Sequence, residues 1–236
     1  MANFPPVLIL AGGLGTRVSS LYPDLPKAMI PVNDEPFIGH QLKLLARENV
    51  TDVILCLGHL SETIVEYVGN GEAFGLNVQY SYDGEKLLGT GGAILKASLG
   101  LNRPFAVLYG DSYLDTNFYP IYDAFQQADK LGVLAVFENK NQMIPSNLSY
   151  KFGMVVHYDK NKPSPNMQYV DYGLSIFKPQ AFSAFADKQS FDLAEVFTAL
   201  IKEKQLAAYE VKDRFYEAGS EQGINELAAY IKIKNK

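Results

Sequence analysis

The stretch Leu8-Ile9-Leu10-Ala11-Gly12-Gly13-Leu14-Gly15-Thr16-Arg17 decides the fold. An apolar run that ends in glycines is typical of a buried strand followed by a tight turn. Glycines let backbone N–H groups approach an anion closely, and Arg17 and Lys27 add two cations just beyond the turn. The spacing differs from the dinucleotide fingerprint and from the P-loop. The stretch therefore predicts a phosphate-binding turn of another kind.

Length and composition restrict the class of protein. The chain has 236 residues, 47% of them hydrophobic, and we expect one domain over residues 1–236. A net charge of -5 argues against nucleic-acid partners and anionic membranes, because both require a strong positive field. No apolar run approaches the roughly 20 residues of a membrane helix. The single cysteine, Cys56, lies in an apolar run and is expected in the core, which suits a reducing cytoplasm.

Strand and helix patterns alternate along the chain. Strands are expected at residues 6–11, 52–58, 76–82, 104–109, 132–137, 152–158, 169–177 and 206–211, and helices at 36–49, 59–68, 93–99, 117–131, 192–204 and 221–233. This order predicts an α/β fold with a doubly wound, mainly parallel sheet. Residues 139–178 are richer in strand signals and are expected to form a small β-rich lobe within the domain, with a loop at 139–149.

Further motifs follow the first glycine turn. They are Gly89-Thr90-Gly91-Gly92-Ala93, Leu108-Tyr109-Gly110-Asp111, Lys162-Pro163, Val170-Asp171-Tyr172-Gly173 and Phe215-Tyr216-Glu217-Ala218-Gly219-Ser220. Open α/β sheets place their chemistry at the carboxyl ends of strands, which is where Asp111 is expected. With the first stretch, these motifs resemble the sugar-1-phosphate nucleotidyltransferases, in particular the heptose 1-phosphate and mannose-1-phosphate guanylyltransferases. The resemblance spans about residues 7 to 220.

The resemblance implies a role for each motif. The nucleotide would contact Leu10, Ala11, Gly12, Gly13, Gly15, Thr16, Gly89 and Thr90, and the sugar would contact Gly110, Asp171 and Gly173. Arg17 would face the leaving pyrophosphate, Lys27 the phosphate under attack and Lys162 the sugar phosphate. Asp111 and Glu217 would hold Mg²⁺, a hard cation that prefers carboxylate and phosphate oxygens.

The implied reaction joins a nucleoside triphosphate and a sugar 1-phosphate into a nucleoside diphosphate sugar and pyrophosphate. Positioning and charge neutralisation would carry the rate, because the attacking phosphate is already anionic. Asp83 and Glu85 precede the second glycine segment and favour GTP, because guanine presents two adjacent donors to a carboxylate. The alternative for these two residues is a solvated acidic turn. Uridylyl transfer to N-acetylmuramate 1-phosphate or a hexose 1-phosphate is the alternative reaction.

Several departures from the family pattern leave alternatives open. The family usually has aspartate where Glu217 stands, so Glu217 is either a metal ligand or a structural residue. Lys160 competes with Lys162 as the sugar-phosphate lysine. Asp115 is expected to cap the helix near Thr116 and Asn117, and assistance to the metal is the alternative. Nucleotidyl transfer to a non-sugar phosphate and a non-catalytic regulatory subunit are the remaining alternatives.

Overall fold

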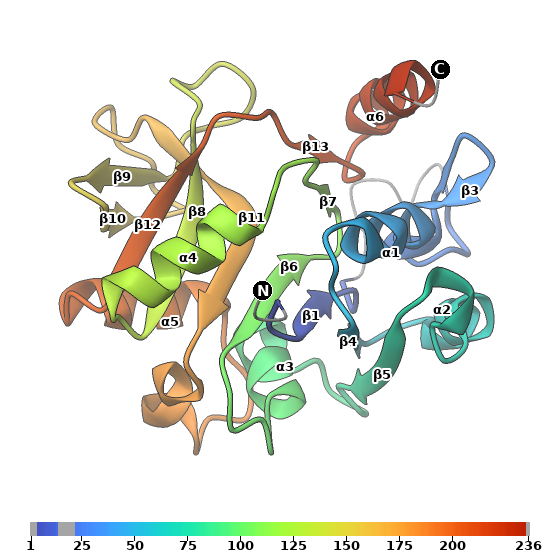
Figure 1. The fold of residues 1–236 in the computed structure, drawn as a ribbon, viewed down its shortest axis with the longest axis horizontal. Coiled ribbons are helices and arrows are strands. Elements are labelled where there is room, and N and C mark those ends of the chain that lie inside the picture. The colour runs from blue at the N-terminus through green and yellow to red at the C-terminus, as the bar shows by residue number, and fades with distance from the viewer. Residues whose placement is uncertain (1–3, 14–21, 235–236) are drawn as a thin grey trace. The chain divides into compact units, whose positions relative to one another are not determined.

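The computed structural model describes residues 4–13 and 22–234. It divides into two compact units, which are drawn in Figure 1. Unit 1 consists of residues 1–87, 108–115 and 215–236, and unit 2 of residues 88–107 and 116–214. Strand β6 (Phe105–Tyr109) belongs to both, because its last two residues lie in unit 1.

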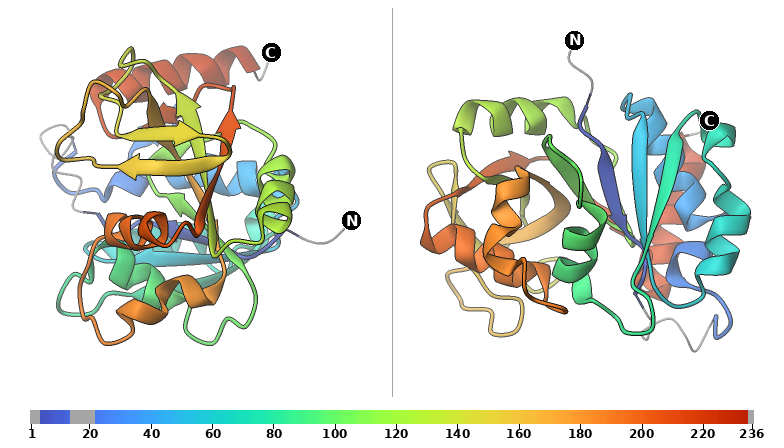
Figure 2. Two further views of the ribbon diagram at one scale, coloured as in Figure 1. Left: turned by 90° about the vertical axis from the view of Figure 1, so that its left-hand side faces the viewer. Right: turned by 90° about the horizontal axis from the view of Figure 1, so that it is seen from below.

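Unit 1 is built on parallel strands in the order β5-β4-β1, with the end of β6 beside β1. Its elements are β1 (Val7–Leu10), η1 (Lys27–Met29), β2 (Pro31–Val32), β3 (Glu35–Pro36), α1 (Phe37–Arg47), β4 (Asp52–Leu57), α2 (Ser61–Val68), η2 (Glu72–Phe74), β5 (Asn77–Tyr82), β7 (Ser112–Tyr113), β13 (Tyr216–Glu217) and α6 (Glu221–Lys234). Helices α1 and α2 lie on the same face of this sheet (Figure 2). Strands β1 and β4 are mostly apolar and buried, as expected for a parallel sheet, whereas β5 is an edge strand in which only Val78 is buried.

Unit 2 carries a mixed sheet in the order β11-β8-β12-β10-β9. Its elements are α3 (Gly89–Ala97), α4 (Tyr119–Ala128), β8 (Gly132–Glu138), β9 (Leu148–Lys151), β10 (Met154–Tyr158), β11 (Tyr169–Phe177), η3 (Pro179–Phe185), α5 (Leu193–Lys202) and β12 (Leu206–Val211). Helix α4 lies on one face of the sheet and α5 on the other (Figure 2). Phe177 contacts the rings of Phe105, Phe182 and Phe197 at centroid distances of 6.2, 5.4 and 6.0 Å, which forms an aromatic core.

The predicted α/β order of elements is confirmed, and the prediction of a mainly parallel sheet holds for unit 1. It is wrong for unit 2, where β12 pairs with β8 in parallel but β11–β8, β10–β12 and β10–β9 are antiparallel. The expected 139–149 loop contains the start of β9, and Phe152 lies in the β9–β10 turn instead of a strand. Phe152 and Gly153 both have positive φ, 51° and 75°, the backbone that a two-residue hairpin turn requires.

Glycines allow strands of unit 1 to meet closely at their carboxyl ends. A Cβ at Gly12 would lie 2.8 Å from the backbone N of Gly58, and one at Gly110 would lie 2.2 Å from the carbonyl O of Leu10. The N–H of Gly110 donates to that same carbonyl at 3.1 Å. Gly13, in contrast, has no atom within 4 Å of its Cβ position and is exposed. Gly12 and Gly110 are therefore packing glycines, whereas Gly13 faces open space.

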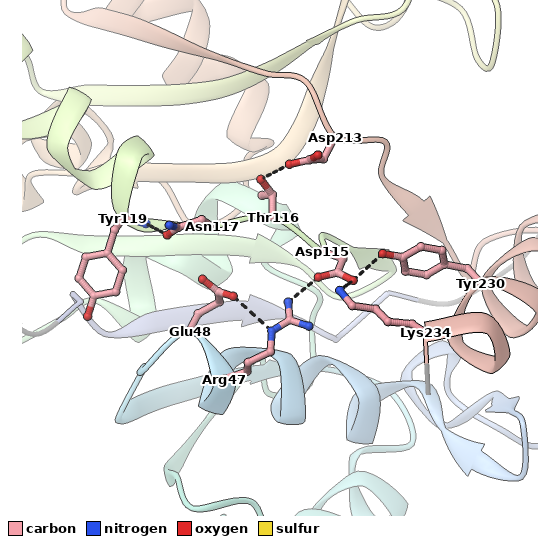
Figure 3. A network of polar contacts seen from close by, with 9 residues as sticks. All are labelled: Arg47, Glu48, Asp115, Thr116, Asn117, Tyr119, Asp213, Tyr230 and Lys234. Carbon is pink, nitrogen blue, oxygen red and sulfur yellow. Dashed lines mark hydrogen bonds and ion pairs between the residues drawn. The ribbon is translucent and has the colours of Figure 1, made fainter. Parts of the chain in front are cut away.

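Asp115 connects the last helix of unit 1 to the rest of that unit (Figure 3). Its carboxylate accepts from Arg47 of α1 at 2.5 Å, from the Tyr230 hydroxyl of α6 at 2.6 Å and from Lys234 at the end of α6. The expected capping role of Asp115 is wrong, because Asn117 accepts from the N–H of Tyr119 instead. Burial would raise the pKa of Asp115, but hydrogen bonds from Lys234, Tyr230 and Arg47 outweigh it and hold that pKa below its ordinary value.

No helix among residues 4–13 and 22–234 is both long enough and apolar enough to span a membrane.

The two neighbouring glycines of the first turn give a matched test of packing. Gly12→Ala should lower the free energy of unfolding by about 1–3 kcal/mol, because the new methyl group meets the Gly58 backbone. Gly13→Ala should change it by less than about 0.5 kcal/mol. Urea denaturation of both variants measures the difference, and equal losses would contradict the packing role of Gly12.

Asp115→Asn should destabilise the protein at pH 7 by about 1.5–3 kcal/mol, the range for hydrogen bonds to a charged group. The Asp115 side chain is 5% exposed, so solvent screens it little. Because its pKa is lower in the folded state than the value of about 3.9 in an unfolded chain, its stabilisation is present above pH 4 and is lost as pH falls further, through the folded-state pKa. Denaturation at pH 7 and at pH 3 should therefore show the difference between wild type and variant shrinking on acidification. Asp129→Asn, which removes a surface ion pair with Lys178, is the control and should have little effect at pH 7.

Candidate nucleotide and phosphate site

The predicted site residues fall into two groups. Unit 1 contains Leu10, Ala11, Gly12, Gly13, Lys27, Asp83, Glu85, Gly110, Asp111 and Glu217, and unit 2 contains Gly89, Thr90, Lys162, Asp171 and Gly173. Gly15, Thr16 and Arg17 lie outside the described residues, so their roles stay predictions.

Lys27 and Asp111 meet, although 84 positions separate them in the sequence. Lys27 opens the short helix η1 directly after Pro26, and Asp111 follows the end of β6. The Lys27 Nζ lies 2.6 Å from Asp111 Oδ2, with side chains 15% and 32% exposed. The Lys27 side chain is therefore mostly buried beside a carboxylate and is not an exposed loop lysine. The pair places one cation and one anion at the carboxyl end of β6.

A short ribbon places Glu217 beside Asp111. Strands β7 and β13 are antiparallel, and Glu217 is opposite Ser112, the residue after Asp111. The N–H of Ala218 donates to the Asp111 carbonyl at 2.9 Å. The two predicted metal ligands are therefore held on neighbouring strands.

The Glu217 carboxylate is also bound to the start of α6. Its Oε2 accepts from the N–H of Gly219 at 2.6 Å, and its Oε1 accepts from the Ser220 hydroxyl. Ser220 in turn accepts from the N–H of Gly223 at 3.0 Å, so it caps α6. Glu217 thus has a structural role, and its oxygens retain further lone pairs for a cation.

The donor set fits a magnesium ion by its chemistry. Mg²⁺ is usually held by one or two carboxylates together with substrate phosphates and water, and Asp111 and Glu217 are two such carboxylates. The described residues contain no cluster of three or more histidine, cysteine or acidic side chains that would form an all-protein cage.

Gln41 is a neighbour of Asp111 that the sequence analysis missed. It lies on α1, is 1% exposed, and donates from Nε2 to the Tyr109 and Ser112 carbonyls at 2.9 and 2.8 Å. These two carbonyls flank Gly110 and Asp111. The available signal was a polar residue on the apolar stripe of the predicted 36–49 helix, between Ile38 and Leu42.

The second glycine segment forms the first turn of α3, four residues earlier than predicted. The N–H groups of Gly91 and Gly92 donate to the Phe191 carbonyl at 2.9 and 3.3 Å, and the Leu193 N–H donates to the Thr90 hydroxyl at 2.8 Å. A Cβ at Gly91 would lie 2.3 Å from the Phe191 ring. This contact leaves no room for a side chain at position 91. Gly89 has φ +69° and lies against the Phe191 backbone.

The two competing lysines of the 159–166 loop have different surroundings. Lys160 is paired with Asp192 at 2.5 Å, and Asp192 also accepts from Ala194 to cap α5. Burial would raise the pKa of Asp192, but the hydrogen bonds of Lys160 and Ala194 lower it. The Lys162 side chain is exposed, and its backbone N–H donates to Asp159 at 2.9 Å. In the described part of the chain, no ion pair is found for the Lys162 ammonium group.

Asp171 and Gly173 lie together at an irregularity in β11. The register with β8 shifts between Asp171 and Ser175, and Gly173 has φ +97°, where a side chain would be strained. The Gly173 N–H donates to Asp171 Oδ1 at 2.9 Å. The Asp171 side chain therefore stabilises the bulge.

Asp83 and Glu85 follow the carboxyl end of β5, the same edge of the unit 1 sheet as Gly12. The Asp83 N–H donates to the Leu57 carbonyl at 2.9 Å, and Glu85 is exposed.

Cys56 is 2% exposed, as predicted for a core residue, and burial raises the pKa of its thiol to about 12. A thiol of that pKa is protonated at neutral pH and inert.

Comparison with known proteins gives the same family as the motifs. The model of the Nucleotidyl transferase family matches residues 6–230. D-glycero-alpha-D-manno-heptose 1-phosphate guanylyltransferase of Campylobacter jejuni is 29% identical over 90% of this chain and 93% of its own length. UTP--glucose-1-phosphate uridylyltransferase of Synechocystis is 28% identical over 82% of this chain, which spans only 54% of that protein.

A solved structure shows the same fold. HddC from Yersinia pseudotuberculosis, complexed with GMP-PN, superposes with a TM-score of 0.80 over 97% of this chain and 100% of its own, at 23% identity. The chain therefore belongs to the Nucleotidyl transferase family, and it is an enzyme of the sugar-1-phosphate nucleotidyltransferase type that its motifs predict.

Proposed function

We propose that this enzyme transfers the nucleoside monophosphate group of GTP to a heptose or hexose 1-phosphate, giving a nucleoside diphosphate sugar and pyrophosphate. The observation that carries the proposal is the Lys27–Asp111 pair at the end of β6, in the same unit as the glycine turn after β1. The sugar phosphate and the triphosphate are both anionic, so a site for them needs fixed cations and an exposed backbone turn. Lys27 and Gly13 meet those requirements.

Each residue contributes through charge or position. Lys27 would neutralise the phosphate under attack, and the backbone at Gly12 and Gly13 would donate to nucleotide phosphates. Arg17 would stabilise the leaving pyrophosphate. Asp111 and Glu217 would hold Mg²⁺, which when bound would screen the negative charge of the phosphates. No protein nucleophile is needed, because the sugar phosphate oxygen attacks the α-phosphorus directly. We place this reaction in the cytoplasm.

The preference for GTP is supported by two separate observations. The Campylobacter relative is named for guanylyl transfer and is aligned over nearly its full length. Asp83 and Glu85 follow the carboxyl end of β5, at the same sheet edge as Gly12, where their carboxylates would accept from the two donors of guanine. The relative from Synechocystis supports the second candidate, uridylyl transfer to a hexose 1-phosphate.

A matrix of five nucleoside triphosphates against a panel of sugar 1-phosphates, scored by pyrophosphate release, tests the proposal. We expect the highest kcat/KM with GTP and a heptose or mannose 1-phosphate. The highest value with UTP would favour the second candidate. A chain that binds nucleotide but releases no pyrophosphate from any pair would contradict both candidates.

Asp111→Asn should lower kcat by about 100-fold or more, because it replaces a carboxylate that would hold Mg²⁺ with a neutral amide, a much weaker ligand of the same size. The fold should be retained, which circular dichroism and the melting temperature can check. The matched control is Asp187→Asn, the same substitution at an exposed residue, which should leave kcat unchanged. Full activity of Asp111→Asn would contradict the role of Asp111.

Lys162→Ala should raise KM for the sugar 1-phosphate about 10-fold or more and leave the melting temperature unchanged, because its ammonium group would bind only substrate. Lys160→Ala removes a half-exposed ion pair worth at most about 1 kcal/mol and should leave KM unchanged. Steady-state kinetics and thermal denaturation of both variants separate the two lysines. A rise in KM for Lys160→Ala alone would assign the sugar phosphate to Lys160 instead.

A further inference from the structure

The buried amide of Gln41 holds the turn that carries Asp111. Gln41 lies on the apolar face of α1 with Ile38, Leu42 and Leu45, all of them fully buried. A primary amide in such surroundings is costly, and the buried Oε1 of Gln41 has no hydrogen-bond partner among the described residues, so only the hydrogen bonds of Nε2 offset the cost. Glutamine at this position therefore needs a reason other than packing, since leucine or methionine would fill the space without that cost.

Both amide hydrogens of Gln41 are used on one short segment. Nε2 donates to the Tyr109 carbonyl at 2.9 Å and to the Ser112 carbonyl at 2.8 Å. Because both partners are acceptors, the NH₂ end of the side chain must be the one that faces them. The two carbonyls are three residues apart, so a single nitrogen bridges the turn formed by Gly110 and Asp111.

Two further backbone groups of this turn are hydrogen-bonded to neighbouring segments. The Gly110 N–H donates to Leu10 of β1 at 3.1 Å, and the Asp111 carbonyl accepts from Ala218 at 2.9 Å. The hydrogen bonds from Gln41 add to these two, and they come from a side chain, whereas the other two join backbone groups. Tyr109 ends β6 and Ser112 begins β7, so Gln41 fixes the change of direction between the two strands.

We propose that Gln41 is a positioning residue that acts through Asp111: its amide sets the backbone on both sides of Asp111 and thereby the direction of the carboxylate. This inference rests on the proposed function, in which Asp111 would hold Mg²⁺ beside the reacting phosphates. A displacement of about 1 Å at such a group is enough to lower a rate by up to about 100-fold. Gln41 itself contacts no substrate, so its loss should lower kcat more than it raises KM.

The test compares Gln41→Met with Leu45→Ala. Methionine has a similar volume but cannot donate, so Tyr109 and Ser112 lose their shared donor. Leu45→Ala creates a cavity on the same helix and leaves the Gln41 amide in place, so it controls for general loss of stability. The two measurements are steady-state kinetics and amide hydrogen exchange of the peptide that covers residues 109–113.

We expect Gln41→Met to accelerate exchange in residues 109–113 and to lower kcat about 10- to 100-fold, with KM changed less than 3-fold. Leu45→Ala should lower the melting temperature and leave kcat within about 2-fold. If Gln41→Met does not fold, Gln41→Asn keeps the amide but is one methylene too short to reach both carbonyls, and it should show the same two effects more weakly. Unchanged exchange, or a kcat no lower than that of Leu45→Ala, would overturn the inference.

Failure of the proposed function gives a different result. In that case the wild-type chain releases no pyrophosphate from any substrate pair. Exchange in residues 109–113 then decides whether Gln41 holds the turn, because that measurement does not depend on turnover.

Discussion

The candidate site in unit 1 depends on backbones that approach each other without side chains between them. Gly12 lies against Gly58 at the ends of β1 and β4, and Gly110 lies against Leu10 at the ends of β6 and β1. Any side chain at Gly12 or Gly110 would separate these strand ends. This close packing brings the exposed Gly13 turn and the Asp111 turn to neighbouring strand ends. The site is therefore determined by backbone geometry first and by charged side chains second.

The charged groups are then fixed by elements from distant parts of the sequence. Lys27 comes from η1, Gln41 from α1 and Glu217 from β13, and all three converge on residues 109–112. Each element contacts a different atom of this segment, so the turn is held from several directions. Such a support is what a group needs if it is to stabilise charge without moving during the reaction.

The sequence was sufficient to predict most elements of both units, and it pointed to Lys27 and Asp111, whose side chains meet in the structure. Periodicity and glycine turns carry this information locally, which is why the Lys27 and Asp111 motifs could be identified separately. Whether neighbouring strands of the unit 2 sheet run parallel or antiparallel was not predictable in the same way. The antiparallel β9–β10 hairpin depends on Phe152 in a left-handed conformation, which sequence patterns do not indicate for a phenylalanine. The contact of Gln41 with Tyr109 and Ser112 depends on the packing of α1 on the sheet, and it becomes visible only in three dimensions.

Glu217 illustrates why a structural role and a functional role need not exclude each other. Its carboxylate accepts two hydrogen bonds at the start of α6, and Gly223 is required there because a Cβ would lie 2.2 Å from Glu217 Oε1. A carboxylate has about four acceptor positions, so two are left. Holding the side chain in advance lowers the conformational entropy that cation binding would cost. The same hydrogen bonds that suggest a purely structural glutamate thus also prepare it for the ligand role that we propose.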